Sequence, residues 1–144
     1  MVVLIDKKDN KIGVEEKIAA HKKGLLHRAF SIFIFNNKGK MLLQRRHKNK
    51  YHSGGLWSNT CCGHPLPGED LLDSSLRRLQ EEMGFSCKLK EVFSFIYKTS
   101  LDNSLIEHEL DHVFIGKYNG PVYANPQEVE QYKSWQKQRL MVIG

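Results

Sequence analysis

The sequence has no long apolar run, few cysteines and no compositional sign of disorder, and each absence excludes a class of protein. No apolar segment approaches the roughly 20 residues of a membrane-spanning helix. The apolar run at residues 1–5 is too short for a signal-peptide core. The 3 cysteines are odd in number and match no CxxC metal motif, which argues against a disulfide framework. With 40% hydrophobic and 26% charged residues, the composition is that of a globular protein. We therefore expect a cytoplasmic protein that binds no membrane.

Positive charge is in moderate excess and is spread along the chain. Lys and Arg number 22 against 16 Asp and Glu, which gives a net charge of +6 with neutral histidines. Such a balance suits nucleic acid, an anionic membrane or a phosphorylated substrate. One local basic cluster lies at residues 45–50, but no stretch has the aromatic and basic pattern of an RNP motif. We expect no nucleic-acid partner.

Local patterns predict most of the strands. The turn signal NNKG at 36–39 separates two β-rich runs, which indicates a hairpin. Residues 46–70 are rich in Gly, Pro, His, Asn and Ser, so we expect a long functional loop there. The polar tail from residue 126 is interpreted as helical, and residues 14–21 look more helical than extended. The predicted strands are 2–6, 31–35, 40–44, 88–98 and 106–116.

The clearest helix spans residues 70–83. Its apolar residues recur at i, i+4, i+7 and i+11, the spacing of a buried stripe, and Gly84 is suited to end it. At about 100° per residue, Glu82 lies near the edge of that stripe and Glu81 faces solvent. We therefore predict that Glu82 looks into a cleft, with Arg78 one turn earlier and close enough to compensate its charge. The stripe consists of Leu72, Leu76, Leu79 and Met83.

Two other segments place polar side chains together. Period-2 alternation in the strand 106–116 puts Glu107, Glu109 and Asp111 on one face. Helical spacing in 14–21 puts Lys17 and His21 one turn apart on a common face.

The stretch GHPLPGEDLLDSSLRRLQEEMGF at residues 63–85 resembles the Nudix box, G-x5-E-x7-R-E-U-x-E-E-x-G-U. One position departs, because Arg78 stands where the box has its first helical Glu. The resemblance implies an α/β (α+β) Nudix fold, with mixed β-sheets packed between helices. The carboxylates of the box hold a hard divalent cation against a diphosphate, so Arg78 argues against the ordinary nucleoside-diphosphate hydrolases of this superfamily. The matching positions are Gly63, Glu69, Arg77, Leu79, Glu81, Glu82, Gly84 and Phe85.

Three further motifs indicate which family within the Nudix superfamily the sequence resembles. NTCCGHP at 59–65 is similar to the active-site loop N-x-x-C-G-H-P of the type I isopentenyl-diphosphate isomerases. EKIAAH at 16–21, followed by His27, resembles the N-terminal metal-binding segment of that family, and EHE at 107–109 resembles its E-x-E strand. The resemblance runs from about residue 3 to about residue 135, with the motifs in the same order.

This resemblance implies a role for each matching residue. The ligands of a first metal ion, Mn²⁺ or Zn²⁺, would be His21, His27, His64, Glu107 and Glu109. Glu82 and the backbone carbonyl of Cys62 would bind Mg²⁺, which bridges the enzyme and the diphosphate. The catalytic acid/base groups would be Cys62 and Glu109, assisted by the phenol of Tyr97. The diphosphate would be gripped by Lys17, Arg46, Lys50 and Arg78.

The implied reaction interconverts isopentenyl diphosphate and dimethylallyl diphosphate. One proton is added to an unactivated alkene and another is lost from the neighbouring carbon, through a tertiary carbocation. An acid and a base must therefore lie on the two faces of the carbon chain, and water must be excluded. The expected partner is a small-molecule prenyl diphosphate, and we expect a monomer.

Two other functions stay open at this point. One is a Nudix diphosphate hydrolase, and the other is a non-catalytic protein that binds a metal or a prenyl diphosphate. The second carries weight because members of the isomerase family have a further C-terminal segment with a Trp, which this sequence does not include. Our expectation is thus a single Nudix domain over 1–144, shortened at the C-terminus, in which Trp57 or Trp135 would have to substitute.

Overall fold

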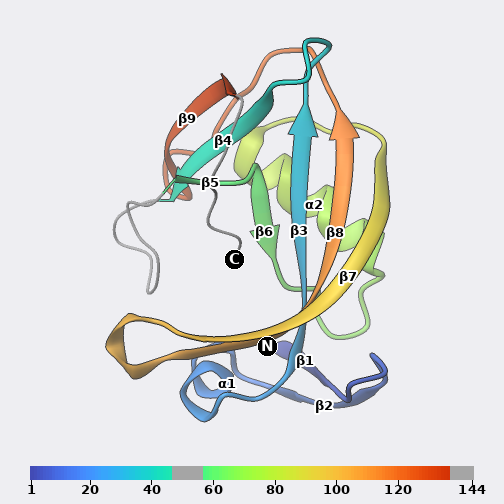
Figure 1. Ribbon diagram of the computed structural model, residues 1–144, viewed down its shortest axis with the longest axis vertical. Coiled ribbons are helices and arrows are strands. Elements are labelled where there is room, and N and C mark those ends of the chain that lie inside the picture. The colour runs from blue at the N-terminus through green and yellow to red at the C-terminus, as the bar shows by residue number, and fades with distance from the viewer. Residues whose placement is uncertain (47–56, 137–144) are drawn as a thin grey trace.

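The computed structural model describes residues 1–46 and 57–136, and nine strands of these residues form one mixed sheet (Figure 1). At its centre, β3 (His27–Phe35) runs parallel to β8 (Ile106–Lys117) and antiparallel to β6 (Cys61–Gly63). β7 (Leu89–Ser100) pairs with β8, and this long hairpin sweeps across the lower part of Figure 1. The remaining strands are β1 (Val2–Ile5), β2 (Lys11–Glu15), β4 (Met41–Arg46), β5 (Trp57–Ser58) and β9 (Val129–Gln136).

Two α-helices of the described residues lie against this sheet. α2 (Leu71–Met83) lies behind β6, β3 and β8 in Figure 1, and α1 (Lys17–Lys23) lies at the lower end, where it contacts β8. A short 3₁₀ helix (Asp102–Ser104) makes the turn between β7 and β8. The arrangement confirms the predicted α+β class with a mixed sheet.

The central strand β3 has one apolar face and one face on which polar residues lie next to a second, smaller hydrophobic cluster that contains Phe33. Side chains alternate between the two faces of a strand, so Phe30, Ile32 and Ile34 share one face. All three are buried in one cluster with Leu79 and Met83 of α2. On the opposite face of β3 lie His27, Ser31 and Phe33. Burying the first set stabilises the fold by roughly 1.5–3 kcal/mol per large side chain, and it leaves the second face available for a polar site.

The ends of α2 are set by the residues that the sequence indicated. The side chain of Asp70 accepts a hydrogen bond from the Asp73 N–H at 3.2 Å, which caps the first turn. Gly84 ends the helix in the left-handed conformation with φ 74°, which a residue without a Cβ adopts at little cost. Glu81 is exposed and Glu82 is buried, as the helical spacing predicted.

The prediction of a helix over 14–21 is wrong at its start. Residues up to Glu15 form β2, which pairs with β1, and α1 begins only at Lys17. The reason is a cap: the carboxylate of Glu16 accepts hydrogen bonds from the N–H groups of Ile18 and Ala19, at 3.1 and 2.8 Å. A capping residue has extended rather than helical dihedrals, so the helix cannot extend further back.

Two other predictions are wrong because of strand pairing distant in sequence. The expected loop over 46–70 contains β5 and β6, held in place by Thr60, whose hydroxyl donates to the Leu42 carbonyl at 2.6 Å. The tail after residue 126, interpreted as helical, instead forms β9, which pairs antiparallel with β4. A strand partner outweighs local propensity in both places.

Candidate functional site

Strand register brings the polar side chains of four strands onto one face of the sheet. His27 of β3 lies opposite Glu109 of β8, and Ser31 lies opposite Cys62 of β6. Tyr97 of β7 lies opposite Glu109 on its other side. Because residues two apart on a strand share a face, these side chains lie on the side of the sheet away from α2.

Four side chains on this face form a group suited to a metal ion. One ligand atom from each lies within 4.8 Å of all the others. Glu109 is the hub, since its Oε2 lies 3.1 Å from the Nε2 of His27 and 2.8 Å from the Nε2 of His64. The group consists of His21, His27, His64 and Glu109.

Backbone carbonyls orient two of the three imidazoles. The Nδ1 of His21 lies 2.7 Å from the Lys17 carbonyl oxygen, and the Nδ1 of His27 lies 2.9 Å from that of Leu25. A carbonyl only accepts, so each Nδ1 carries a hydrogen, and a metal ion would bind each ring through its Nε2 after any proton there is displaced. This is the arrangement found around metal-ligating histidines. Three imidazole nitrogens and a carboxylate are donors that suit Zn²⁺ and Mn²⁺.

The electrostatics of the group favour an ionised carboxylate. Burial raises the pKa of Glu109, but hydrogen bonds from His27 and His64 outweigh burial, and its pKa is lowered. Burial lowers the pKa of His27, but the hydrogen bond and the charge of Glu109 raise it overall. Burial brings the pKa of His64 down to about 4, so this ring is neutral near pH 7. A neutral ring and an anionic carboxylate are the forms that bind a cation.

Tyr97 and Glu107 adjoin this group. The Tyr97 hydroxyl lies 2.6 Å from the Oε1 of Glu107 and 2.6 Å from the Oε1 of Glu109. Burial and the two carboxylates raise the pKa of the phenol. Glu107 is thus brought next to the group through Tyr97, but it is not among the four residues whose ligand atoms lie together.

The two adjacent cysteines face opposite sides of the sheet. Cys61 is fully buried in the apolar layer, and burial raises the pKa of its thiol well above the ordinary value. Cys62 lies on the polar face, with its Sγ 3.1 Å from the Oδ1 of Asn59 and 3.7 Å from the Oγ of Ser31. Of the two thiols, only that of Cys62 lies on the same face of the sheet as the metal-suited group.

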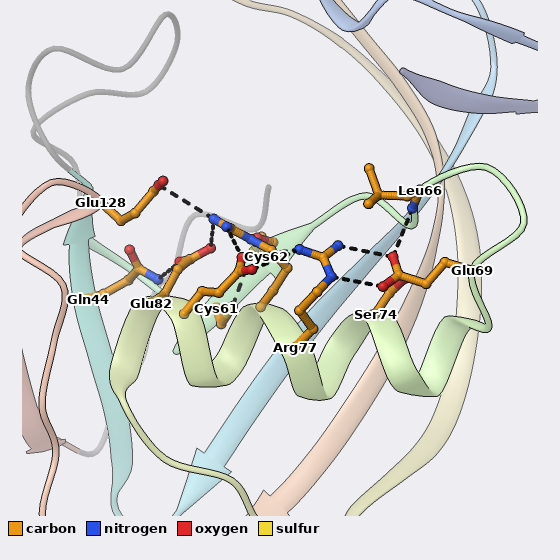
Figure 2. Close-up of polar contacts among 11 residues, drawn as sticks. Gln44, Cys61, Cys62, Leu66, Glu69, Ser74, Arg77, Glu82 and Glu128 are labelled. Carbon is orange, nitrogen blue, oxygen red and sulfur yellow. Dashed lines mark hydrogen bonds and ion pairs between the residues drawn. The ribbon is translucent and has the colours of Figure 1, made fainter.

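A second polar group lies along α2 (Figure 2). The buried Glu82 accepts hydrogen bonds from Gln44 at 2.8 Å and from the guanidinium of Arg78 at 2.6 Å. Burial lowers the pKa of Arg78, but the charge of Glu82 and the hydrogen bond to Glu81 outweigh burial and raise it. Arg78 therefore compensates the charge of Glu82, as its helical spacing predicted.

Glu69, at the start of this group, holds the loop before α2 to the helix. Its carboxylate accepts two hydrogen bonds from Arg77, at 2.8 and 3.0 Å, and others from the Ser74 hydroxyl and the Leu66 N–H. These contacts, led by Arg77, hold the pKa of Glu69 at about 2. Glu69 and Arg77, two of the positions that match the box, thus have a structural role here.

We expect Glu69→Gln to lower the free energy of unfolding at pH 7 by on the order of 2 kcal/mol. The native carboxylate has its pKa depressed from 4.5 to about 2, so its contribution is complete above pH 4.5 and disappears as the pH falls towards 2. Urea unfolding at a series of pH values measures this. Glu81→Gln is the control, because Glu81 binds the same arginine from a more exposed position and should cost about 0.5 kcal/mol or less. An equal loss at pH 7 and near pH 2 would contradict the prediction.

The residues expected to bind a diphosphate lie in different parts of the molecule. Arg78 lies on α2, and its Cγ would lie 3.4 Å from a Cβ at Gly63. Lys17 begins α1, and its charge adds to burial in lowering the pKa of His64. Arg46 ends β4, and Lys50 lies outside the described residues.

The sequence analysis did not predict four polar residues that belong to the site. Asn59 belongs to the NTCCGHP motif, and Asp111 shares a strand face with Glu109, so both had a local signal. Ser31 and Gln44 had no local signal, because each reaches its partner through pairing of strands distant in sequence.

Among the residues that the structure describes, no helix has the length and apolarity to cross a membrane.

Comparisons with known proteins match most of this chain to one family. The family model described as the NUDIX domain matches residues 25–140. The isopentenyl-diphosphate Delta-isomerase 2 of Photorhabdus laumondii is 58% identical over 133 residues, which are 92% of this chain and 75% of that protein. The isopentenyl-diphosphate Delta-isomerase 2 of Aromatoleum aromaticum is 54% identical over 132 residues, which are 92% of this chain and 70% of that protein.

Solved structures show the same fold at low sequence identity. A crystal structure of a Deinococcus radiodurans protein has a TM-score of 0.76 and 16% identity, covering 94% of this chain and 82% of its own. The MutT protein of Methanosarcina mazei has a TM-score of 0.64 and 25% identity, covering 77% and 76%.

Proposed function

The chain belongs to the NUDIX domain family and, within it, to the isopentenyl-diphosphate Delta-isomerases, and on this premise we propose how its residues carry out the isomerisation. The reaction interconverts isopentenyl diphosphate and dimethylallyl diphosphate by adding one proton and removing another. The observation that carries the assignment of roles is the Cys62 thiol on the same sheet face as the group around Glu109. Its substrate is a small prenyl diphosphate, and a monomeric state and a cytoplasmic location stay predictions.

The group around Glu109 is proposed as a centre for Mn²⁺ or Zn²⁺. His21, His27, His64 and Glu109 supply the donor atoms, and Glu107 completes the set beside Tyr97. A cation held there would keep Glu109 ionised and fixed in orientation. The donor set supports this, because three imidazoles and one or two carboxylates match the preferences of both ions.

The polar group along α2, which contains Glu82 and Arg78, is proposed to hold the diphosphate end of the substrate. Glu82 is a buried carboxylate next to β6, and with the Cys62 carbonyl it would bind Mg²⁺ together with the diphosphate. Mg²⁺ bound in this way would neutralise the phosphate charge. Arg78 offers a planar guanidinium that binds phosphate oxygens in pairs. Lys17, Arg46 and Lys50 are proposed as the remaining diphosphate contacts.

Cys62 and Glu109 are proposed as the two proton-transfer groups. They extend from β6 and β8, the strands on either side of β3, so a five-carbon chain lying over β3 would have one on each side. One group gives a proton to the terminal alkene carbon, which leaves a tertiary cation. The other takes a proton from the neighbouring carbon, and the double bond forms one position along. The Tyr97 hydroxyl lies within hydrogen-bond distance of both carboxylates and, with its single hydrogen, donates to one of them, which helps to hold Glu109 in place.

Product analysis tests this function. We expect purified protein with Mg²⁺ and isopentenyl diphosphate to form dimethylallyl diphosphate and no inorganic phosphate. Release of phosphate or of isopentenyl monophosphate would instead indicate the hydrolase. Binding of the diphosphate without any turnover would indicate the non-catalytic alternative. Performing the assay in D₂O adds a check, because the proposed proton addition introduces solvent deuterium at the new methyl group.

A further inference from the structure

We propose that Ser31, with Asp111 behind it, and Asn59 are positioning residues that fix the Cys62 thiol for proton transfer. This inference rests on the proposed function of Cys62. Ser31, Asp111 and Asn59 are each buried to 1% exposure or less, so they act on the thiol and not on bulk solvent.

Strand register makes this line of polar groups unavoidable. Ser31 lies directly opposite Cys62 in the antiparallel β3–β6 pair, and opposite residues of such a pair project to the same face. Asp111 shares the face of Glu109, two residues later on β8. Ser31 therefore lies between the thiol on one side and the carboxyl of Asp111 on the other.

The amide of Asn59 can only accept from the thiol. Its Nδ2 donates both hydrogens, to the carbonyl oxygens of Ile32 at 3.0 Å and Cys61 at 2.9 Å. This leaves the Oδ1, 3.1 Å from the Sγ of Cys62, in a fixed orientation. An acceptor at that distance receives the S–H of the thiol.

Ser31 likewise presents oxygen lone pairs to the thiol. A hydroxyl has one hydrogen, and that of Ser31 is donated to the Oδ2 of Asp111 at 2.6 Å. The Oγ of Ser31 then faces the Sγ of Cys62 at 3.7 Å as an acceptor. The other carboxyl oxygen of Asp111, its Oδ1, has no hydrogen-bond partner among the residues that the structure describes. The hydrogen bond from Ser31 is thus the described contact that accounts for a carboxyl group in this buried position. The same bond sets the direction of the Ser31 hydroxyl.

The consequence is a thiol whose single hydrogen has two fixed acceptors within reach, of which the Oδ1 of Asn59 is the nearer, and whose side-chain rotation is restricted. A cysteine next to apolar neighbours would be free to rotate about χ1, and its proton would point in several directions. Small misplacements of a reacting group lower turnover strongly, by about 100-fold for an error of about 1 Å. Removing the polar groups of Ser31 or Asp111 should therefore reduce kcat and leave substrate binding unchanged.

The test compares two variants with a matched control. Ser31→Ala removes the hydroxyl, and Asp111→Asn keeps the shape but supplies an N–H that donates to Ser31, which reverses the hydrogen bond. Ser75→Ala is the control, because Ser75 is also fully buried but, within the part of the chain that the structure describes, its hydroxyl bonds only to the Leu71 carbonyl of α2. We expect kcat to fall about 10- to 100-fold in both variants, with KM for isopentenyl diphosphate within about twofold and Ser75→Ala close to the parent. Thermal unfolding of each protein shows whether it is folded, and Asp111→Asn carries the test if Ser31→Ala does not fold.

A double-mutant comparison shows whether these residues act through the thiol. In a Cys62→Ala background, Ser31→Ala should lower the residual kcat by no more than about twofold, because the group it positions is absent. Three results would each overturn the positioning role. The first is full activity of both single variants, and the second is a rise in KM that matches the fall in kcat. The third is a fall in kcat on Ser31→Ala that is as large in the Cys62→Ala background as in the parent. Full activity of Cys62→Ala itself would instead refute the proposed function of the thiol, so the two failures are distinguishable.

Discussion

Replacing Cys62 by Ala should lower kcat about 1,000-fold and leave KM for isopentenyl diphosphate within about threefold. A positioned acid/base group contributes roughly 100- to 10,000-fold to a rate, and alanine offers no proton. The diphosphate contacts are proposed on α2 and do not include the thiol, so binding should persist. The side chain is half-buried and small, and its loss should cost little stability. Steady-state kinetics with isopentenyl diphosphate and Mg²⁺ measures the effect.

Cys61→Ala is the control for this experiment. Cys61 is the adjacent thiol, but it is buried in the apolar layer against α2. We expect this variant to lose about 1 kcal/mol of stability through the small cavity and to retain most of its turnover. If Cys61→Ala lost activity as severely as Cys62→Ala in folded protein, or if Cys62→Ala remained active, the assignment of the thiol would be wrong.

The sequence was sufficient to predict the elements whose signals are local. The helix over 70–83 has a capping Asp70, a terminating Gly84 and an apolar stripe, and all three act within one segment. Leu79 and Met83 of that stripe are buried, whereas the prediction is wrong for Leu72, which is exposed near the start of the helix. The structure places α2 at 71–83 with that cap and that end. Helical spacing also distinguished the buried Glu82 from the exposed Glu81, because rotation about a helix axis is fixed by residue number.

Elements that depend on distant partners were not predictable in the same way. β6 lies in a stretch rich in Gly, Pro and Asn, which suggested a loop, and it is a strand because it pairs with β3. β9 pairs with β4 although its own composition is polar. No pattern inside these segments states that a partner strand is present.

The residues of the candidate site also differ in whether their signal was local or depended on distant strand pairing. Motifs named His21, His27, His64 and Glu109, and the structure brings these four together. Ser31 lay in an apolar run, and its relevance depends on a register that places it opposite Cys62. Asp111 was on the predicted acidic face, but only the pairing of β3 with β8 gives it Ser31 as a partner.

Replacing Glu109 by Gln should remove both turnover and metal-dependent stability. The carboxylate contacts His27, His64 and Tyr97, so this one change removes a metal ligand and a proposed proton-transfer group together. Glutamine has nearly the same shape, and its neutral amide is a weak ligand for Mn²⁺ or Zn²⁺. We expect kcat to fall at least about 1,000-fold.

The metal dependence can be measured without activity. An ion at about 100 times its dissociation constant stabilises the native state by about 2.7 kcal/mol, which corresponds to roughly 5–10 °C in Tm for a chain of this size. We expect Mn²⁺ to raise the Tm of the parent by this amount after treatment with a chelator, and to raise that of Glu109→Gln by about 1 °C or less. Glu91→Gln is the matched control, because Glu91 also bonds to a histidine, His112, but lies outside the four-residue group. Glu91→Gln should respond to Mn²⁺ as the parent does, since a lost carboxylate–histidine contact elsewhere on the sheet removes no ligand. An equal Tm response in Glu109→Gln would show that the ion binds at another place, and the proposed centre would then have to be abandoned.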